Sequence, residues 1–303
     1  MGVLLGLAAA ISWGMGDYII ASLTRRIGTY RALCATQIGS LLSWLVLLLV
    51  LRSTKEGALS FDASLWGIAF LAAVCHVVAL LLTYRSFEIG TLSLVSPITS
   101  SFSVVTAVLA LASGERLPLL KLVGAGILVM GIMLATRAPS EGKSHLAGVP
   151  EAIFSALGFG LMFWLFEKVE GDLGYIWPLI LMKSLATSSS VWIVGHQKRR
   201  NARNEVVSEA VPEVPASAPG RWSPLWLLAG GVALSDTLAW VVYAYGVRQE
   251  QYVTVVTAVA SLFSVVTVLM AWAFLRERLA RNQWIGVAII FLGILLVSLN
   301  VSA

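Results

Sequence analysis

Ten apolar runs, each about 20 residues long, limit what this chain can fold into more than any other feature of its sequence. A helix of that length crosses the roughly 30 Å hydrocarbon core of a bilayer, where only helices and closed barrels satisfy every backbone hydrogen bond. Hydrophobic residues make up 58% of the chain and charged residues 12%, against about 25% charged in a soluble domain. The sequence therefore predicts an all-α, polytopic membrane protein of ten transmembrane helices, near residues 3–23, 31–51, 64–84, 91–112, 119–136, 147–167, 174–195, 224–246, 252–274 and 283–300.

The basic residues and the cysteines exclude several other classes of protein. A net charge of +5 would suit a nucleic-acid partner in a soluble protein, but Lys and Arg fall mainly between the spans, where they set topology. We therefore expect a small-molecule substrate and the lipid bilayer as partners, and no nucleic acid. Cys34 and Cys75 lie inside apolar runs without ligand or disulfide spacing, so we interpret them as small buried hydrophobic residues.

The second half of the chain repeats part of the first. An offset of 161 residues superimposes one short motif on another, pairing Ser100, Phe102, Ser103, Val104, Val105 and Thr106 with Ser261, Phe263, Ser264, Val265, Val266 and Thr267. After an insertion of one residue, an offset of 162 pairs Glu115, Arg116, Leu117 and Gly124 with Glu277, Arg278, Leu279 and Gly286. Spans four and five therefore repeat as spans nine and ten. A weaker match links span one to span six by pairing Gly14 and Gly16 with Gly158 and Gly160.

This repeat divides the chain into two five-span halves, residues 1–137 and 138–303, the second of which includes a polar loop at 196–223 that we expect to be flexible. Because five is odd, a chain that weaves across the bilayer enters its second half from the opposite side, so the halves form an inverted-topology repeat. Two similar halves that face opposite ways can exchange conformations and open a midplane site to each side in turn. The pattern favours transport over an inert helical bundle or a subunit anchor.

Three motifs inside these halves are characteristic: Ser12-Trp13-Gly14 in span one, the run from Val95-Ser96-Pro97 to Gly114-Glu115-Arg116-Leu117, and its second copy ending in Arg276-Glu277-Arg278-Leu279. They resemble the EamA-like module of the drug/metabolite transporter superfamily. That resemblance implies a ten-helix transporter of two five-helix repeats, with a cavity lined mainly by spans one, three, four, six, eight and nine. It also implies a substrate among amino acids, nucleotide-linked sugars, drugs and other metabolites. Many members carry a second proline in span four where this chain has Ser103, so a kink there stays open.

Two arguments about the orientation of the chain disagree. The loops that follow odd-numbered spans hold 14 Lys and Arg residues, and the loops that follow even-numbered spans hold 6. By the positive-inside rule, both termini then face away from the cytoplasm. The family resemblance implies the opposite orientation, with both termini in the cytoplasm. We expect the charge count to decide, because its excess is large.

Four ionisable residues lie within spans, where each needs a water-filled cavity or a partner because an unpaired charge costs about 2.5 to 3.5 kcal/mol on insertion scales. Asp17 is a candidate site for a cation or a proton, or else a structural partner of the arginines that end span one. His76 is a candidate proton relay, or else a hydrogen-bonded packing residue. Asp236 is a candidate coupling site, and we expect Lys183 to neutralise one of the two carboxylates in a buried pair.

Hydroxyl and aromatic side chains complete the candidate site. Serines and threonines recur every three or four residues on one face of spans four and nine, and from them we take Ser96, Ser100, Thr257 and Ser261 as site residues. Such faces pack helices together in lipid, and they also offer hydrogen bonds to a polar ligand. The deeper aromatic residues either stack on a planar or cationic ligand or pack toward lipid, and they are Trp13, Trp164, Trp240 and Tyr243.

Together these features predict a secondary transporter in the plasma or inner membrane. We expect an exporter of small metabolites, amino acids or drug-like compounds that works by alternating access, with protons as a candidate coupling ion. An intramembrane enzyme and a channel-like subunit are the alternatives. The sequence offers no catalytic constellation, no pair of His or Cys with metal-site spacing and no nucleotide-binding motif, so we expect neither an enzyme nor a cofactor. We expect a monomer or a homodimer.

Overall fold

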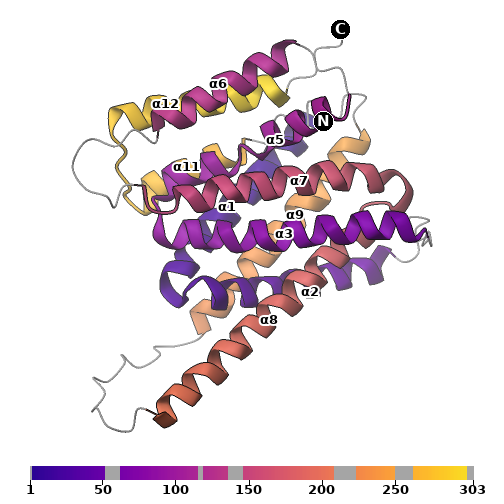
Figure 1. Cartoon of the computed structure of the whole chain (residues 1–303), viewed down its shortest axis with the longest axis vertical. Coiled ribbons are helices and arrows are strands. Elements are labelled where there is room, and N and C mark those ends of the chain that lie inside the picture. The colour runs from indigo at the N-terminus through magenta and orange to yellow at the C-terminus, as the bar shows by residue number, and fades with distance from the viewer. Residues whose placement is uncertain are drawn as a thin grey trace.

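Each predicted span contains a helix in the computed structural model, which describes residues 2–51, 62–114, 119–135, 146–207, 223–249 and 262–298 (Figure 1). The first half contributes α1 (Gly2–Ile27), α2 (Thr29–Leu51), α3 (Ala63–Ile89), α4 (Leu92–Thr99), α5 (Phe102–Ala112) and α6 (Leu119–Ala135). The second half contributes α7 (Val149–Leu173), α8 (Ile176–Val207), α9 (Ser223–Gln249), α11 (Phe263–Phe274) and α12 (Arg281–Ser298). These ranges contain no strand, which confirms the predicted all-α class.

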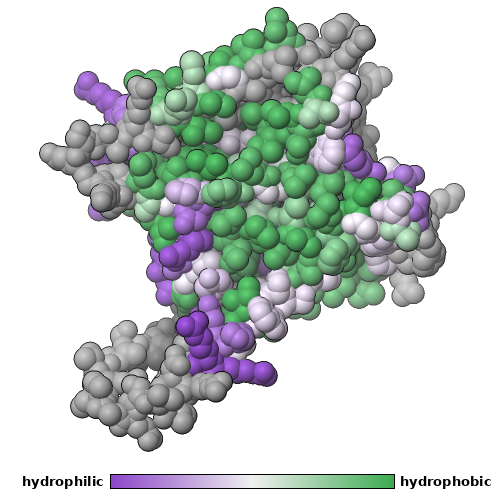
Figure 2. Space-filling view, in the orientation of Figure 1, coloured by the Kyte–Doolittle hydropathy of each residue, from purple (hydrophilic) through white to green (hydrophobic). Residues whose placement is uncertain are grey.

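The outer surface of the bundle is apolar, as a lipid environment requires. Six of the described helices are long and apolar enough to cross a membrane. On α2, for example, Leu42, Val46 and Leu49 follow one another along one face, and all three are exposed. Figure 2 shows apolar side chains covering most of the visible face, with polar ones gathered at its margins. We conclude that this apolar surface faces lipid chains, which do not drive it into the protein interior as water would.

Glycines end the first helix of each half. Gly28 and Gly174 both have positive φ, +81° and +66°, and each lies in the short turn that follows α1 or α7. A residue without Cβ adopts this left-handed conformation at little cost, which is why glycine commonly ends a helix. The two glycines are 146 residues apart, so α1 and α7 end at equivalent points of the repeat.

Span four is broken into two helices. Pro97 lies inside α4, which ends at Thr99, and α5 begins at Phe102. At the break, serine hydroxyls add hydrogen bonds to backbone carbonyl groups: Ser100 donates to the Pro97 carbonyl, and Ser101 donates to the Ile98 carbonyl, which also accepts the Ser101 backbone N–H. The interruption therefore forms without a proline at position 103, with Pro97 inside α4 and two serine hydroxyls beside it.

The helices pack in reciprocal pairs. In the described residues α1 packs along α9 and α7 along α3, while α1 contacts α11 and α7 contacts α5. The pairs α2–α8 and α6–α12 each join two equivalent helices, and α6 and α12 form a separate layer at one edge of the bundle (Figure 1). Exchanging the two halves leaves this set of neighbours unchanged, as the inverted repeat predicts.

Two close contacts define the register between the first helices of the two halves. A Cβ added to Gly14 would lie 2.6 Å from the Phe263 carbonyl oxygen, and one added to Gly160 would lie 2.8 Å from the Phe102 carbonyl oxygen. Phe102 and Phe263 are themselves repeat partners, so Gly14 corresponds to Gly160, again at an offset of 146. The pairing of Gly14 with Gly158 predicted from the sequence is therefore wrong by two residues. The sequence pairing was the one that aligned most glycines. In the structure, the equivalent glycines are those that lie against a neighbouring backbone.

The predicted flexible loop at 196–223 is wrong in its first part, because α8 continues to Val207. The residues from 196 to 207 include glutamine, one lysine, three arginines and alanine, which favour helix, and contain neither glycine nor proline. At about 1.5 Å per residue, α8 is roughly 48 Å long and extends beyond the bundle (Figure 1). Its exposed Lys198, Arg199 and Arg200 lie on this extension. Residues 208–222 lie outside the described ranges.

Glu277 ties the turn before α12 to the start of α4. Its carboxylate accepts hydrogen bonds from the backbone N–H groups of Leu92 (3.1 Å) and Ser93 (2.8 Å) and forms an ion pair with Arg25 at 2.8 Å. A carboxylate at a helix N-terminus satisfies N–H groups that have no partner within the helix and interacts favourably with the helix dipole. The acidic residue of the second Glu-Arg-Leu motif thus caps a half-helix of the other repeat. Its repeat partner, Glu115, lies outside the described residues.

Candidate functional site

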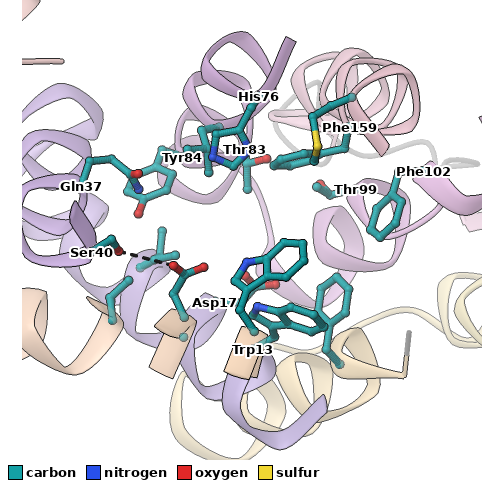
Figure 3. A pocket seen from close by; sticks show the side chains of 18 of the residues that line it. Trp13, Asp17, Gln37, Ser40, His76, Thr83, Tyr84, Thr99, Phe102 and Phe159 are labelled. Carbon is teal, nitrogen blue, oxygen red and sulfur yellow. Dashed lines mark hydrogen bonds between the residues drawn. The ribbon is translucent and has the colours of Figure 1, made fainter. Parts of the chain in front are cut away.

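A cavity of about 150 Å³ lies between the two halves, near the break in span four. This volume accommodates on the order of ten water molecules, so it suits a small ligand better than a large one. Its walls come from α1, α2, α3, α4, α5, α7, α8, α9 and α11, with Thr99 at the end of α4 and Phe102 at the start of α5 on either side of the break. The lining residues are Trp13, Gly16, Asp17, Ile20, Gln37, Ser40, His76, Leu80, Thr83, Tyr84, Thr99, Phe102, Phe159, Met162, Phe163, Lys183, Val232, Asp236, Trp240 and Phe263 (Figure 3).

Asp17 is the carboxylate that α1 contributes to this cavity. The hydroxyls of Ser96 and Thr267 each donate a long hydrogen bond of 3.4 Å to its Oδ2. None of the described basic side chains forms an ion pair with Asp17, and Arg25 instead pairs with Glu277. The structural role that the sequence left open, a pair with the arginines that end span one, is therefore not what the structure shows. The two hydroxyls orient the carboxylate but leave its charge uncompensated.

The second carboxylate, Asp236 on α9, has a basic partner from α8. Lys183 Nζ lies 2.8 Å from Asp236 Oδ2, and the hydroxyl of Ser40 on α2 donates to the same oxygen at 3.5 Å. The Lys183 side chain is 3% exposed and that of Asp236 is 23% exposed, because the carboxylate faces the cavity. The predicted buried pair thus forms between Lys183 and Asp236. Such a pair keeps two charges in a region of low polarity that would not hold either one alone.

Two further polar side chains face the cavity with atoms that have no hydrogen-bond partner in the described part of the chain. Both ring nitrogens of His76 on α3 are buried and unpaired, and so is Oε1 of Gln37 on α2. The His76 ring instead lies edge-on to the Phe159 ring, with 5.9 Å between centroids. Buried polar atoms usually have a partner, so a polar ligand or water in the cavity is the natural partner for these groups.

Aromatic rings form the rest of the wall. Trp13 meets Trp240 edge to face at 5.5 Å between centroids, and the Phe102 ring stacks on Phe163 at 4.7 Å. Phe263 continues the stack from Phe102, at 6.5 Å. Figure 3 places Gln37 and Ser40 toward one end of the cavity and Phe102 and Phe159 toward the other. The cavity therefore has a polar end and an aromatic end.

Six of the residues selected from the sequence line the cavity, namely Trp13, Asp17, His76, Lys183, Asp236 and Trp240. Others lie next to it: Ser96 contacts Asp17, and the ring of Tyr243 lies 5.9 Å from that of Trp13.

Two of the selected residues lie elsewhere. Ser100 donates to the Ser264 hydroxyl at 2.9 Å and is buried, so it joins α4 to α11 in the packing role that the sequence also allowed. The ring of Trp164 lies beneath the Lys168 ammonium, 4.3 Å from it, rather than at the cavity. Thr257 and Ser261 lie outside the described residues.

The phenylalanines and the polar groups of α2 were not among the site residues expected from the sequence. Phe102 and Phe263 gave a usable signal, because they are identical at the 161-residue offset, but as apolar residues they could equally face lipid. Phe159 and Phe163 correspond to Trp13 and Asp17 only in the correct 146-residue register. Gln37 and Ser40 have ordinary polar side chains in an apolar helix, a pattern that also serves helix packing.

Comparison with known proteins agrees with this architecture. The EamA-like transporter family matches residues 1–137 and 210–299. A solved structure described only as the crystal structure of a protein has a similar fold, with a TM-score of 0.57 and 13% sequence identity over 97% of this chain and 95% of that one. No curated protein matches the chain.

These matches confirm the resemblance found in the sequence motifs. The matched ranges omit residues 138–209, which contain α7 and α8, although the packing of Gly160 shows α7 to be the counterpart of α1. Because the matched ranges still cover most of its length, this chain belongs to the EamA-like transporter family and is a multi-pass membrane transporter of the drug/metabolite type.

Proposed function

We propose that this transporter is a secondary carrier that exports small metabolites, amino acids or drug-like compounds across the plasma or inner membrane by alternating access. The supporting observation is the position of the cavity, which is lined by helices of both halves near the break in span four. A site held between two inverted repeats changes its exposed side when the halves exchange conformations.

We further propose that transport is coupled to protons. Asp17, His76 and Asp236 all face the cavity, so a proton taken up from one side of the membrane would be carried with the site. Asp17 is the strongest candidate, because Asp236 is already engaged by Lys183. Its two hydroxyl partners can accept a hydrogen bond from a protonated carboxyl group as well as donate to a charged one.

Reconstitution in liposomes tests this function. A carrier gives flux that saturates with substrate and accelerates exchange when unlabelled substrate is present on the opposite side. A channel-like subunit gives neither counterflow nor saturation at the same substrate concentrations. Accumulation driven by an imposed pH gradient, and abolished when a protonophore collapses the gradient, would support proton coupling, while accumulation that ignores the gradient would refute it.

A further inference from the structure

The charges that line the cavity do not balance. Lys183 and Asp236 neutralise each other across 2.8 Å, and His76, which has no acidic partner among the described residues, is counted as neutral. The carboxylate of Asp17 is left over, and its side-chain partners among the described residues are two neutral hydroxyls. Burial of an uncompensated carboxylate is costly unless a counter-ion or water meets it. The site can thus accept one additional positive charge, which either a proton or a cationic ligand supplies.

The internal repeat shows that this charge is not part of the common framework. In the register fixed by Gly14 and Gly160, Asp17 corresponds to Phe163. The same position of the repeat therefore supplies a carboxylate from α1 and a phenyl ring from α7, and both line the cavity. Phe163 stacks on Phe102, and Phe159 lies 6.2 Å from the same ring. One half of the protein contributes the charge and the other contributes an apolar surface.

We propose that the substrate is an amphipathic organic cation, which binds with its ammonium group at Asp17 and its apolar body against the rings of Phe102, Phe159 and Phe163. This inference rests on the proposed transport function and names the substrate class of the same site. Trp13, one helical turn before Asp17 on α1, places an indole ring at the cavity wall, where it can attract the same cation through its π face. A cavity of about 150 Å³ favours a single aromatic or short aliphatic group.

The site disfavours an anionic substrate. Among the described lining residues, Lys183 is the one lysine or arginine, and its ammonium is already paired with Asp236 and is 3% exposed. A carboxylate or phosphate would have to displace Asp236 from this pair and also approach the unpaired charge of Asp17. A neutral ligand would avoid that repulsion, but then only a proton would neutralise Asp17.

A series of three probes with the same phenyl group tests this inference on the purified full-length protein. Isothermal titration calorimetry would compare trimethyl(2-phenylethyl)ammonium, 2-phenylethanol and 3-phenylpropionate. We expect the ammonium probe to bind at least about tenfold more tightly than the other two, because unlike charges attract strongly in a region of low polarity. In Asp17→Asn that advantage should disappear while affinity for 2-phenylethanol is unchanged. Asp17→Glu should retain a preference for the cation.

Glu167→Gln is the matched control, because it also replaces a carboxylate by an amide but lies exposed on α7 away from the cavity. It should bind all three probes like the wild type. Equal or tighter binding of 3-phenylpropionate, no binding of the ammonium probe at millimolar concentration, or full cation affinity in Asp17→Asn would each overturn the inference. If Asp17→Asn fails to fold, the probe series on the wild type still decides.

Counterflow in liposomes separates a failure of this inference from a failure of the proposed function. Saturable counterflow of a neutral or anionic compound, with none for the ammonium probe, would reject the cation while the carrier function stands. Tight, Asp17-dependent binding of the ammonium probe without any counterflow would support the binding site and reject transport of this class of compound.

Discussion

Breaking the ion pair between Lys183 and Asp236 should destabilise the folded protein strongly and unequally. Removing one partner of a buried pair costs about 3 to 5 kcal/mol, because the other charge is left without compensation. Asp236→Asn leaves the Lys183 ammonium, which is 3% exposed, and we expect a loss near 5 kcal/mol. Lys183→Met leaves the Asp236 carboxylate, which is 23% exposed to the cavity and keeps the Ser40 hydroxyl, so we expect a loss nearer to about 3 kcal/mol.

Unfolding in detergent, followed by tryptophan fluorescence with increasing denaturant, measures both losses. The double variant Lys183→Met/Asp236→Leu contains neither charge, so it should recover most of the stability that either single change removes. Lys168→Met is the control, because this exposed lysine on α7 contacts the Trp164 ring and forms no ion pair with any described residue. Wild-type stability in Asp236→Asn, or losses in the double variant equal to the sum of the two single losses, would refute the reasoning.

Four other outcomes are expected. Gly14→Ala should destabilise the protein by about 1 to 3 kcal/mol, because its Cβ would meet a backbone carbonyl of α11, whereas Gly67→Ala, with nothing within 4 Å, should be neutral or stabilising in the same melting assay. Glu277→Gln should cost about 1.5 to 3 kcal/mol through the weakened contact with Arg25 and the α4 terminus, and wild-type melting would contradict this. Arg200→Cys, in a background without other reactive cysteines, should be protected from impermeant thiol reagents in intact cells, and ready labelling would show that the charge count gives the wrong orientation. If Asp236 has a functional role, its Asn variant should alter flux or its pH dependence wherever the protein folds, and wild-type flux at every pH would reject that role.

The spans and the interior charges could be predicted because each follows from the large free energy of placing a local stretch of sequence, or a single charge, in the bilayer. An apolar run of about 20 residues has few alternatives in a bilayer, and a charge within such a run must turn inward. Asp17, His76, Lys183 and Asp236 come from four different helices, yet this one rule brought all of them to the cavity. Their pairing was harder to predict, because it depends on which helices are neighbours.

The register between α1 and α7 could not be obtained by matching residues. Small residues occur on several faces of a membrane helix, so an offset that pairs two glycines can score better than the correct one. The position at which a Cβ would strike another backbone identifies Gly14 and Gly160 as equivalent, and this contact exists only in three dimensions. The phenylalanines of the cavity were missed for a similar reason, since an apolar ring suits lipid, core and ligand equally well.

The differences between the halves carry as much information as their similarity. In the correct register, Arg25 corresponds to Gly171, which has no side chain. Arg25 pairs with Glu277 and donates hydrogen bonds to the Phe87 and Gly90 carbonyls. The network at the end of α1 thus cannot be reproduced by the residue at the same position of α7. When the two halves exchange conformations, the two resulting states have equal free energies only if each makes equivalent contacts. Because Gly171 stands at the position of Arg25 in the second half, the described ion pair with Glu277 has no direct counterpart there, and we expect the states that open toward opposite sides of the membrane to differ in free energy.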